Sequence, residues 1–323
     1  MSIDIDQLLQ GQRRALAKAI TLTESKLDSH REQAQQLINA ILPHTGKSVR
    51  LGITGIPGVG KSTFIEALGL HLVESGKKVA VLAVDPSSPI TGGSILGDKT
   101  RMERLSQQDA AFIRPSPSSG ALGGVAQKTR ETILLCEAAG YDVIIVETVG
   151  VGQSEYEVAA MVDFFLVLML PNAGDELQGI KKGILELADS IVVNKADGDS
   201  KNMAKRTKSH YQNALHLLQH SGFWTPQVLT CSAVENKNID SVWEVVTEFH
   251  TKAKENSHLE NIRAQQNRDW MWKLVHELLE LHLKNNPKTN SIRGVMEQKV
   301  ISNQITPFEA ANTIMSGLID PTD

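Results

Sequence analysis

With 323 residues, 41% of them hydrophobic and 22% charged, the chain is expected to fold as a globular protein with a large core. Its formal net charge of -4 gives no electrostatic reason to expect nucleic-acid binding, and two cysteines are too few for a disulfide framework. No apolar run approaches the roughly 20 residues that span a bilayer, and the N-terminus lacks a signal-peptide core. We therefore expect a cytoplasmic protein that binds neither membranes nor nucleic acid.

Residues 1–46 are predicted to form a helical extension. Leu8, Leu16 and Ile20 recur at helical spacing. Ser29, followed three residues later by Glu32, predicts a capped start for a further helix. We expect this extension to pack on the main domain or on a partner.

Residues 47–254 alternate between strand-like and helical patterns. The strand-like runs are continuously apolar, which indicates strands buried on both faces. The predicted fold class is therefore α/β, with a mostly parallel sheet, helices on both faces and function at the carboxyl ends of the strands. The predicted strands are 49–54, 78–84, 142–147, 164–170, 189–194 and 227–231.

Residues 255–323 return to helical patterns. One apolar stripe continues until Pro287, and Thr306 with Glu309 predicts another capped helix start. A terminal arm of this kind has little of its own to bury its apolar face against. We therefore expect it to form a dimer interface, to which Trp270 and Trp272 are candidate contributors.

The clearest chemical motif follows the first predicted strand. It fits the phosphate-binding pattern G-x-x-x-x-G-K-[ST], with a strand before it and a helical pattern after it, so the predicted α/β fold is that of a P-loop NTPase. Its glycines let backbone N–H groups turn around a phosphate, Lys61 would reach the β- and γ-phosphates, and the Ser62 hydroxyl would hold Mg²⁺. The motif consists of Gly55, Ile56, Pro57, Gly58, Val59, Gly60, Lys61, Ser62 and Thr63.

A second motif, N-K-x-D, closes a later apolar strand and matches the base-recognition element of GTPases. The Asp197 carboxylate can accept from the ring N–H and the exocyclic amine of guanine together, whereas adenine offers no such pair of donors on that edge. The loop after the next strand resembles the one that contacts the guanine carbonyl. We therefore predict GTP and GDP as the ligands. The candidate base-binding residues are Asn194, Lys195, Asp197, Ser232, Ala233 and Val234.

A third motif, E-T-V-G, begins with Glu147 and ends with Gly150, where most GTPases have D-x-x-G. The Glu147 carboxylate is expected to face Mg²⁺ or its water shell, and the Gly150 N–H to contact the γ-phosphate. Ras-like enzymes place a water-orienting glutamine directly after this glycine, but here Val151 stands there and the nearest glutamine is Gln153. We therefore predict slow intrinsic hydrolysis assisted by a partner, with Gln153 as a candidate catalytic residue.

Two further carboxylates are candidate Mg²⁺ ligands beside Ser62 and Glu147. Asp85 ends the second apolar strand, and Asp98 lies in the Gly-, Ser- and Pro-rich stretch that follows, where a GTPase has its first switch. Asp98 is also a candidate catalytic residue, together with Lys61 and Glu147. A turn-stabilising role is the alternative for Asp98.

Residues 174–183 combine glycines with charged residues after another apolar strand, and they suggest one more nucleotide-responsive loop. Spacing alone favours a solvated helix start for Lys181 and Lys182.

Together these motifs resemble those of the MeaB-type GTPases, the bacterial relatives of human MMAA, over essentially the whole chain. The most specific stretches are 55–63, 85–89, 92–102, 147–155 and 175–183.

The resemblance implies a homodimeric GTPase that acts as a chaperone of adenosylcobalamin-dependent methylmalonyl-CoA mutase. In that family, GTP binding and hydrolysis gate cofactor loading and protect the mutase from inactivation. The resemblance also implies that Asp85, Asp98 and Glu147 surround Mg²⁺, and that Lys181 lies in the loop that signals the nucleotide state to the mutase.

Two other functions stay open from the sequence. Related proteins have been described as lysine/arginine/ornithine transport ATPases or kinases, so an ATP-dependent kinase linked to transport is the main alternative. The Asp197 motif argues against ATP as its nucleotide. A structural dimer in which the nucleotide only stabilises the fold is a third possibility.

Overall fold

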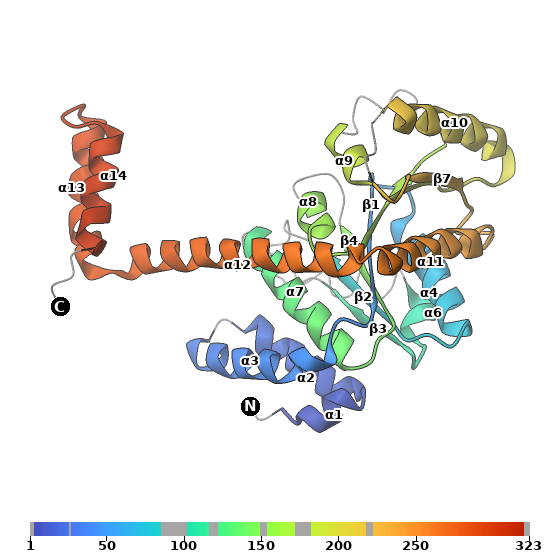
Figure 1. Cartoon of the computed structure of the whole chain (residues 1–323), viewed down its shortest axis with the longest axis horizontal. Helices are drawn as coiled ribbons and strands as arrows, with labels where there is room; N and C mark the ends of the chain where they lie inside the picture. Colours follow the sequence, from blue (N-terminus) through green and yellow to red (C-terminus); the bar gives the residue numbers. More distant parts are fainter. Residues whose placement is uncertain are drawn as a thin grey trace. The chain divides into compact units, whose positions relative to one another are not determined.

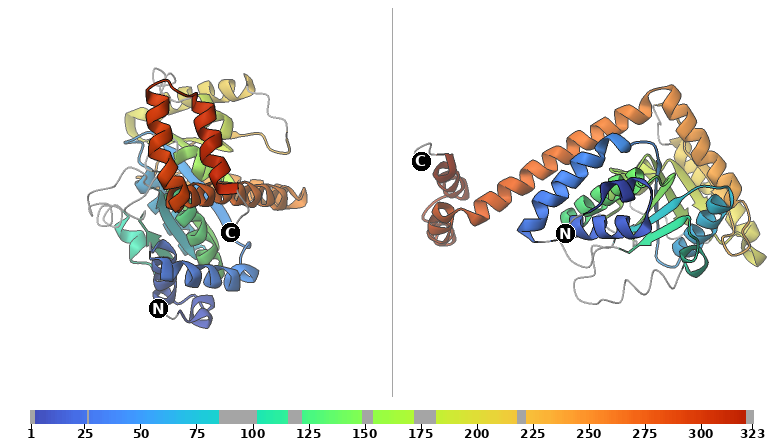
Figure 2. Two further views of the ribbon diagram at one scale, coloured as in Figure 1. Left: turned by 90° about the vertical axis from the view of Figure 1, so that its left-hand side faces the viewer. Right: turned by 90° about the horizontal axis from the view of Figure 1, so that it is seen from below.

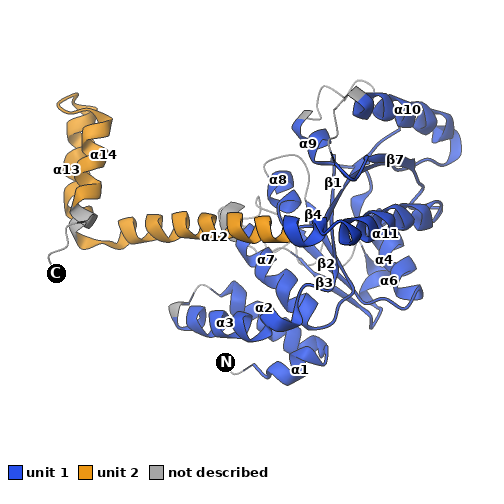
Figure 3. Ribbon diagram, viewed as in Figure 1, with its two compact units in different colours: residues 1–262 blue, residues 263–323 orange. Residues whose placement is uncertain are grey.

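The computed structural model describes residues 3–25, 27–84, 102–115, 122–148, 154–171, 182–217 and 222–319. The chain divides into two compact units, residues 1–262 and residues 263–323 (Figure 3). No helix in the described part of the chain has the length and hydropathy needed to cross a bilayer.

In the described residues, a seven-stranded parallel sheet forms the centre of the first unit (Figure 1). Its strand order is β3-β2-β4-β1-β5-β6-β7. This confirms the predicted α/β class. The strands are β1 (Val49–Gly55), β2 (Val79–Val84), β3 (Ala111–Arg114), β4 (Val143–Thr148), β5 (Phe164–Met169), β6 (Ser190–Val193) and β7 (Gln227–Thr230).

The order of the strands places β1 next to both β4 and β5. From β1 the chain continues to β2 on one side, and later to β5, β6 and β7 on the other. Open parallel sheets bind ligands at such a switch point, outside the carboxyl ends of the strands. The phosphate-binding motif follows β1, so it lies at this point.

The edge strand β3 is the one strand of the described sheet that the sequence analysis did not predict. It has only four residues and ends with the partly exposed Arg114, so it lacks the long apolar run by which the others were recognised. It is held as a strand by its parallel pairing with β2, which its own sequence does not indicate.

Helices cover both faces of the sheet, and alternate strand residues point into two separate cores. Ala80 and Ile144 belong to one core, whereas Val81 and Ile145 belong to the other. One face carries α4 (Lys61–Glu74), α6 (Glu103–Ser106) and α11 (Ile239–Glu255). The other carries α7 (Leu122–Ala138), α8 (Ser154–Ala159), α9 (Lys182–Leu187) and α10 (Lys201–Leu217).

The N-terminal helices share the core on the α7 face. Leu8, Leu16 and Ile20 are fully buried in it. The helices are α1 (Ile5–Leu9), α2 (Arg13–Glu24) and α3 (Asp28–Ile41), followed by the 3₁₀ turn η1 (Leu42–His44).

The predicted capping of α3 by Ser29 is wrong. The helix already begins at Asp28, with Leu27 at the N-cap position, so Ser29 lies inside its first turn. Ser25 orders the approach to the helix instead, because its hydroxyl accepts from the Leu27 N–H at 3.3 Å and lies 2.8 Å from His30 Nδ1.

Three aspartates fix the register of the strands at their amino ends, opposite the carboxyl ends where ligands are expected to bind. Each directly precedes a strand, and its carboxylate accepts a backbone N–H at or next to the start of a neighbouring strand. The bonds are Lys78 N to Asp142 Oδ2 at 2.7 Å, Arg50 N to Asp163 Oδ2 at 2.8 Å, and Phe165 N to Asp189 Oδ2 at 2.8 Å. Burial raises the pKa of Asp189 to about 7, although the hydrogen bond from the Phe165 N–H acts to lower it.

The second unit contains most of α12 (His258–Asn285), and α13 (Pro287–Ile301) and α14 (Pro307–Ile319), which pack side by side (Figure 2). The predicted cap of α14 is confirmed, since the Glu309 N–H donates to Thr306 Oγ1 at 3.1 Å. Among the described residues of this unit, Ala310 is the only buried hydrophobic side chain. Its exposed large hydrophobic residues are Met271, Trp272, Leu278, Leu279, Leu281, Val295, Ile301, Phe308 and Met315.

A buried ion pair joins the sheet, α7 and the end of the N-terminal extension. Arg50 of β1 donates from Nε and Nη2 to the two carboxylate oxygens of Glu137, each at 2.9 Å. Glu137 Oε2 also accepts from the Gly46 N–H at 2.9 Å. The side chains of Arg50 and Glu137 are 12% and 0% exposed, so solvent screens this pair little.

We expect Glu137→Gln to lower the free energy of unfolding by about 3 kcal/mol, because it leaves the Arg50 guanidinium buried without its counter-charge. Urea denaturation at neutral pH measures this. Glu131→Gln on the same helix is the control. Burial raises the pKa of Glu131, so loss of its charge should leave stability unchanged or slightly higher. Equal losses in both variants would contradict this account.

Candidate functional site

The loop between β1 and α4 depends on glycine at several positions. Gly58 and Gly60 have φ of +79° and +90°, which residues with a Cβ rarely adopt. A Cβ on Gly55 would lie 2.6 Å from the Leu168 carbonyl oxygen, and one on Gly60 would lie 3.0 Å from Asn194 Nδ2. The glycines therefore let the loop lie directly against the ends of the neighbouring strands.

Lys61 begins α4 and is only 8% exposed. Its ammonium donates to the Gly55 carbonyl at 2.7 Å and approaches that of Ile56 at 3.4 Å. Burial lowers the pKa of Lys61, while the negative charges of Glu147 and Glu155 act to raise it. The loop thus holds a poorly solvated cation where a phosphate chain could bind.

Glu155 is a site residue that the sequence analysis did not single out. It lies at the start of α8, is 1% exposed, and acts electrostatically on Lys61. Its presence in the family-specific stretch 147–155 was the available signal. Glu147, which was predicted, is the last residue but one of β4 and is 7% exposed.

The side-chain amide of Asn194 joins three loops of the site. Its Nδ2 donates to the Val59 carbonyl of the phosphate-binding loop at 3.0 Å. Its Oδ1 accepts from the Ala233 N–H, in the loop after β7, at 3.1 Å. Asn194 is 1% exposed, so these contacts are shielded from water. Asn194 therefore positions the loops, a role that its motif alone did not reveal.

Lys195 and Asp197 make the next connections. Lys195 has a φ of +57°, and its Nζ donates to the Gly58 carbonyl at 2.7 Å. Ser232, which is 1% exposed, donates to Asp197 Oδ2 at 2.5 Å. Asp197 itself is half-buried. The carboxylate predicted to read the base is thus oriented by a buried hydroxyl from the neighbouring loop.

These contacts bring the predicted phosphate and base motifs together at the carboxyl ends of the strands. The carboxyl ends of β1, β4, β6 and β7 all lie on this side of the sheet because the strands are parallel. A cavity of about 260 Å³ extends along α4 from Thr63 to Glu74, next to the loop after β7, which contributes Ala233 and Val234 to its lining. The Val234 side chain is 79% exposed at the rim.

The other predicted site residues lie outside the described residues: Asp85, Asp98, Gly150, Gln153 and Lys181. Within the part of the chain that is described, no group of three or more His, Cys, Asp or Glu side chains could hold a metal ion. Ser62, half-buried in the first turn of α4, and Glu147 offer the oxygen donors that Mg²⁺ prefers. The set Ser62, Asp85, Asp98 and Glu147 stays a prediction.

A glycine loop between a central parallel strand and a helix that begins with a lysine defines a P-loop nucleotide-binding protein. The family model described as methylmalonyl-CoA mutase-associated GTPase MeaB matches residues 16–288, and the chain belongs to this family. This confirms the resemblance inferred from the motifs.

Individual relatives agree with this family membership. The chain is 54% identical over 280 residues to GTPase ArgK of Escherichia coli (strain K12), covering 86% of this chain and 85% of that protein. It is 47% identical over 319 residues to the mitochondrial methylmalonic aciduria type A homolog of Mus musculus, covering 95% of this chain and 77% of that protein. A solved structure of an LAO/AO transport system kinase aligns with a TM-score of 0.78 and 43% identity, covering 97% of this chain and 96% of that one.

Asn194→Ala should lower the free energy of unfolding by about 1–3 kcal/mol, since the Val59 carbonyl and the Ala233 N–H lose a buried partner. It should also weaken GDP binding, because the two loops are no longer held together. Urea denaturation and titration with a fluorescent GDP analogue measure these effects. Asn213→Ala, at an exposed position of α10, is the matched control. GDP affinity equal to that of the wild type would refute the positioning role.

Proposed function

We propose that the chain binds GTP at this site and hydrolyses it to GDP and phosphate. The observation that carries the proposal is the Asn194 bridge, which joins the phosphate-binding loop to the loop that orients the base-reading carboxylate. The family description and the name of the Escherichia coli relative, both of which specify a GTPase, support it.

Each described residue of the site has a role in this reaction. Lys61 and the amides of its loop bind the phosphate chain, and the low exposure of Lys61 strengthens that attraction. Asp197 selects guanine by accepting from its ring N–H and its amine. Mg²⁺, when bound by Ser62 and Glu147 with Asp85 and Asp98, would neutralise charge on the phosphates. Water attacks the γ-phosphate in line.

We also propose that hydrolysis by the isolated chain is slow. Val151 occupies the place where Ras-like enzymes have the water-orienting glutamine. Gln153 would act only when a partner orders it. A single-turnover rate typical of activated GTPases, measured without a partner, would contradict this.

Asp197→Asn should reverse the base preference. The asparagine amide repels the guanine amine but can donate to the carbonyl that xanthine carries at that position. We expect GDP affinity to fall about 100-fold and xanthosine diphosphate to become the tighter ligand, because each mispaired polar group costs about 1–3 kcal/mol. Competition against a fluorescent GDP analogue measures both affinities.

Asp199→Asn, at an exposed position nearby, controls for the change of charge.

The same competition assay tests the alternative function, an ATP-dependent kinase linked to transport, which the name of the aligned kinase structure suggests. If ATP displaces GDP from the wild-type protein as well as GTP does, the GTPase proposal fails.

The output of the nucleotide cycle is, we propose, the state of methylmalonyl-CoA mutase. The chain would gate loading of adenosylcobalamin onto the mutase and protect that enzyme from inactivation, with Lys181 in the loop that signals the nucleotide state. The family description and the mouse relative's name support this partner. The free, buried cysteines Cys136 and Cys231 suit the reducing cytoplasm that we propose as the location.

The second unit is proposed to form a homodimer. Its helices expose Trp272, Leu278 and Leu281 at 55%, 58% and 43%, while few of its described side chains are buried. Exposed apolar residues on this scale are typical of a protein–protein interface.

Inactivation of the mutase during turnover tests the chaperone role. With GTP, the wild-type chain should slow the loss of mutase activity, and Lys61→Ala should abolish this protection because it removes the phosphate-binding cation. Lys47→Ala, at an exposed position, should protect like the wild type. Protection by Lys61→Ala equal to the wild type would favour a structural dimer. Light scattering on the wild-type chain alone should give twice the chain mass, and a monomer would contradict the dimer.

A further inference from the structure

Helix α10 carries an unusual concentration of positive charge for a protein with a net charge of -4. Its seventeen residues include four lysines and arginines and two histidines but no aspartate or glutamate. The lysines and arginines are Lys201, Lys205, Arg206 and Lys208, and the histidines are His210 and His216.

Three other surface helices, α11, α12 and α13, each contain a cation that pairs within the helix. Lys252 pairs with Glu248 one turn away at 2.7 Å, and Lys284 pairs with Glu280 in the same way. Arg293 likewise pairs with Glu297 at 2.8 Å. Among the described residues, none of the four α10 cations forms an ion pair. Their charge is therefore available to an external partner.

Arg206 aside, the cations of α10 are arranged along one stripe of the helix. Its buried face consists of Ala204, Thr207, Tyr211 and Leu215, spaced by three or four residues. The neighbouring stripe is displaced by one residue, about 100° around the helix. The members of this stripe are Lys201, Lys205, Lys208, Gln212 and His216.

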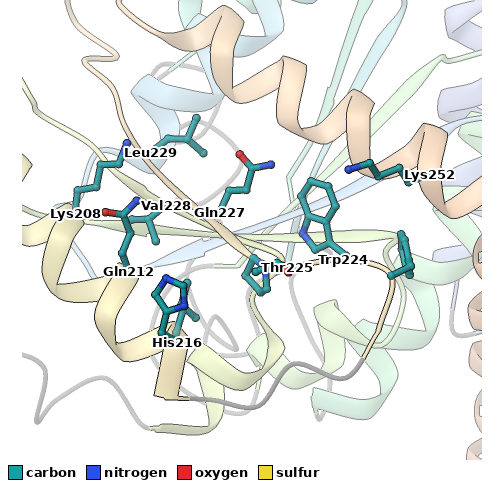
Figure 4. Close-up of a pocket in the computed structure, with 12 residues that line it drawn as sticks. Lys208, Gln212, His216, Trp224, Thr225, Gln227, Val228, Leu229 and Lys252 are labelled. Carbon is teal, nitrogen blue, oxygen red and sulfur yellow. The ribbon is translucent and has the colours of Figure 1, made fainter.

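The part of this stripe from Lys208 onward forms one wall of a groove of about 690 Å³ (Figure 4), and Lys205 lies one turn before it. Lys208, Gln212 and His216 line the groove from α10, and the edge strand β7 contributes Gln227 and Leu229. No carboxylate lines it among the described residues. The groove lies in the first unit, away from the motifs assigned to the nucleotide.

The opposite wall is apolar and electrically balanced. Trp224 packs there, and Lys252 Nζ lies 5.6 Å from its ring centroid. Because Glu248 pairs with Lys252, the excess positive charge of the groove comes from the α10 side. A ligand should therefore carry negative groups on one side and apolar groups on the other.

We propose that this groove binds an extended acidic peptide segment of a partner protein, in which carboxylates alternate with apolar residues. An extended chain directs successive side chains to opposite sides, so the carboxylates can face Lys208, with Lys205 one turn further along α10, while the apolar residues face Phe223 and Leu229. The volume of the groove is large enough for several side chains, and all of its lining residues belong to the first unit.

One detail favours a peptide over a nucleic acid as the ligand. Trp224 is 8% exposed and its Nε1 donates to the Asp189 carbonyl at 2.9 Å, so its ring is not presented for stacking on a nucleobase. The geometry therefore suits a peptide better than a nucleic acid.

Fluorescence anisotropy with the full GDP-bound chain tests the proposal. The probe is a labelled short peptide of alternating glutamate and valine, with serine–valine as the neutral comparison. Lys205→Gln/Lys208→Gln should weaken binding at least about tenfold, whereas the exposed pair Lys18→Gln/Lys47→Gln should change it less than about twofold. GTP hydrolysis and thermal stability should remain at wild-type values in both.

A second variant separates the groove from charge alone. Gln212→Trp leaves every charge in place but fills the groove, and it should also weaken peptide binding about tenfold. Equal weakening by the control pair, unaffected binding to Gln212→Trp, or no saturable binding would overturn the proposal. Tighter binding of duplex DNA or phosphatidylserine vesicles with the same dependence on Lys205 and Lys208 would overturn it too, because the occupant would then be another class of molecule.

Discussion

The buried amide of Asn194 is the contact on which the arrangement of the nucleotide site depends. It donates to the carbonyl of Val59, 135 residues earlier in the chain, and accepts from the N–H of Ala233, 39 residues later. An amide can satisfy a donor and an acceptor at once, which a carboxylate or an ammonium cannot do. The parallel sheet makes the contact possible because it brings the ends of β1, β6 and β7 to the same edge. Gly60 completes it, since a side chain there would meet the Asn194 amide.

Charge is used differently in different parts of the chain. At the site, the cation of Lys61 is poorly solvated and faces the carboxylates of Glu147 and Glu155, so small changes in its surroundings have large electrostatic effects. On α11, α12 and α13, exposed cations pair one turn away, where solvent makes each pair weak. Helix α10 follows neither arrangement, because its exposed lysines have no counter-charge among the described residues. This contrast is why the groove beside α10 is interpreted as a binding surface.

Sequence patterns predicted much of the first unit, and the exceptions have physical reasons. Six strands were recognised because strands buried on both faces are continuously apolar, whereas β3 is short and its order depends on pairing with β2. Ser29 was given a capping role by its spacing from Glu32, but α3 begins one residue earlier and Ser25 orders the turn before it. Glu155 had the chemistry of a site residue, but only its burial beside Lys61 shows its involvement.

The sequence by itself determined the phosphate-binding loop, the base-recognition motif and the alternation of strands and helices. Those signals are local, since each depends on residue type and spacing within a short stretch. Only the tertiary structure decided that Asn194 bridges the loops, that Ser232 orients Asp197, and that Lys208 of α10 lines a groove with Trp224. These are contacts between elements distant in the chain. They arise from how the helices and strands pack, and no local pattern of residues specifies which distant side chains will meet.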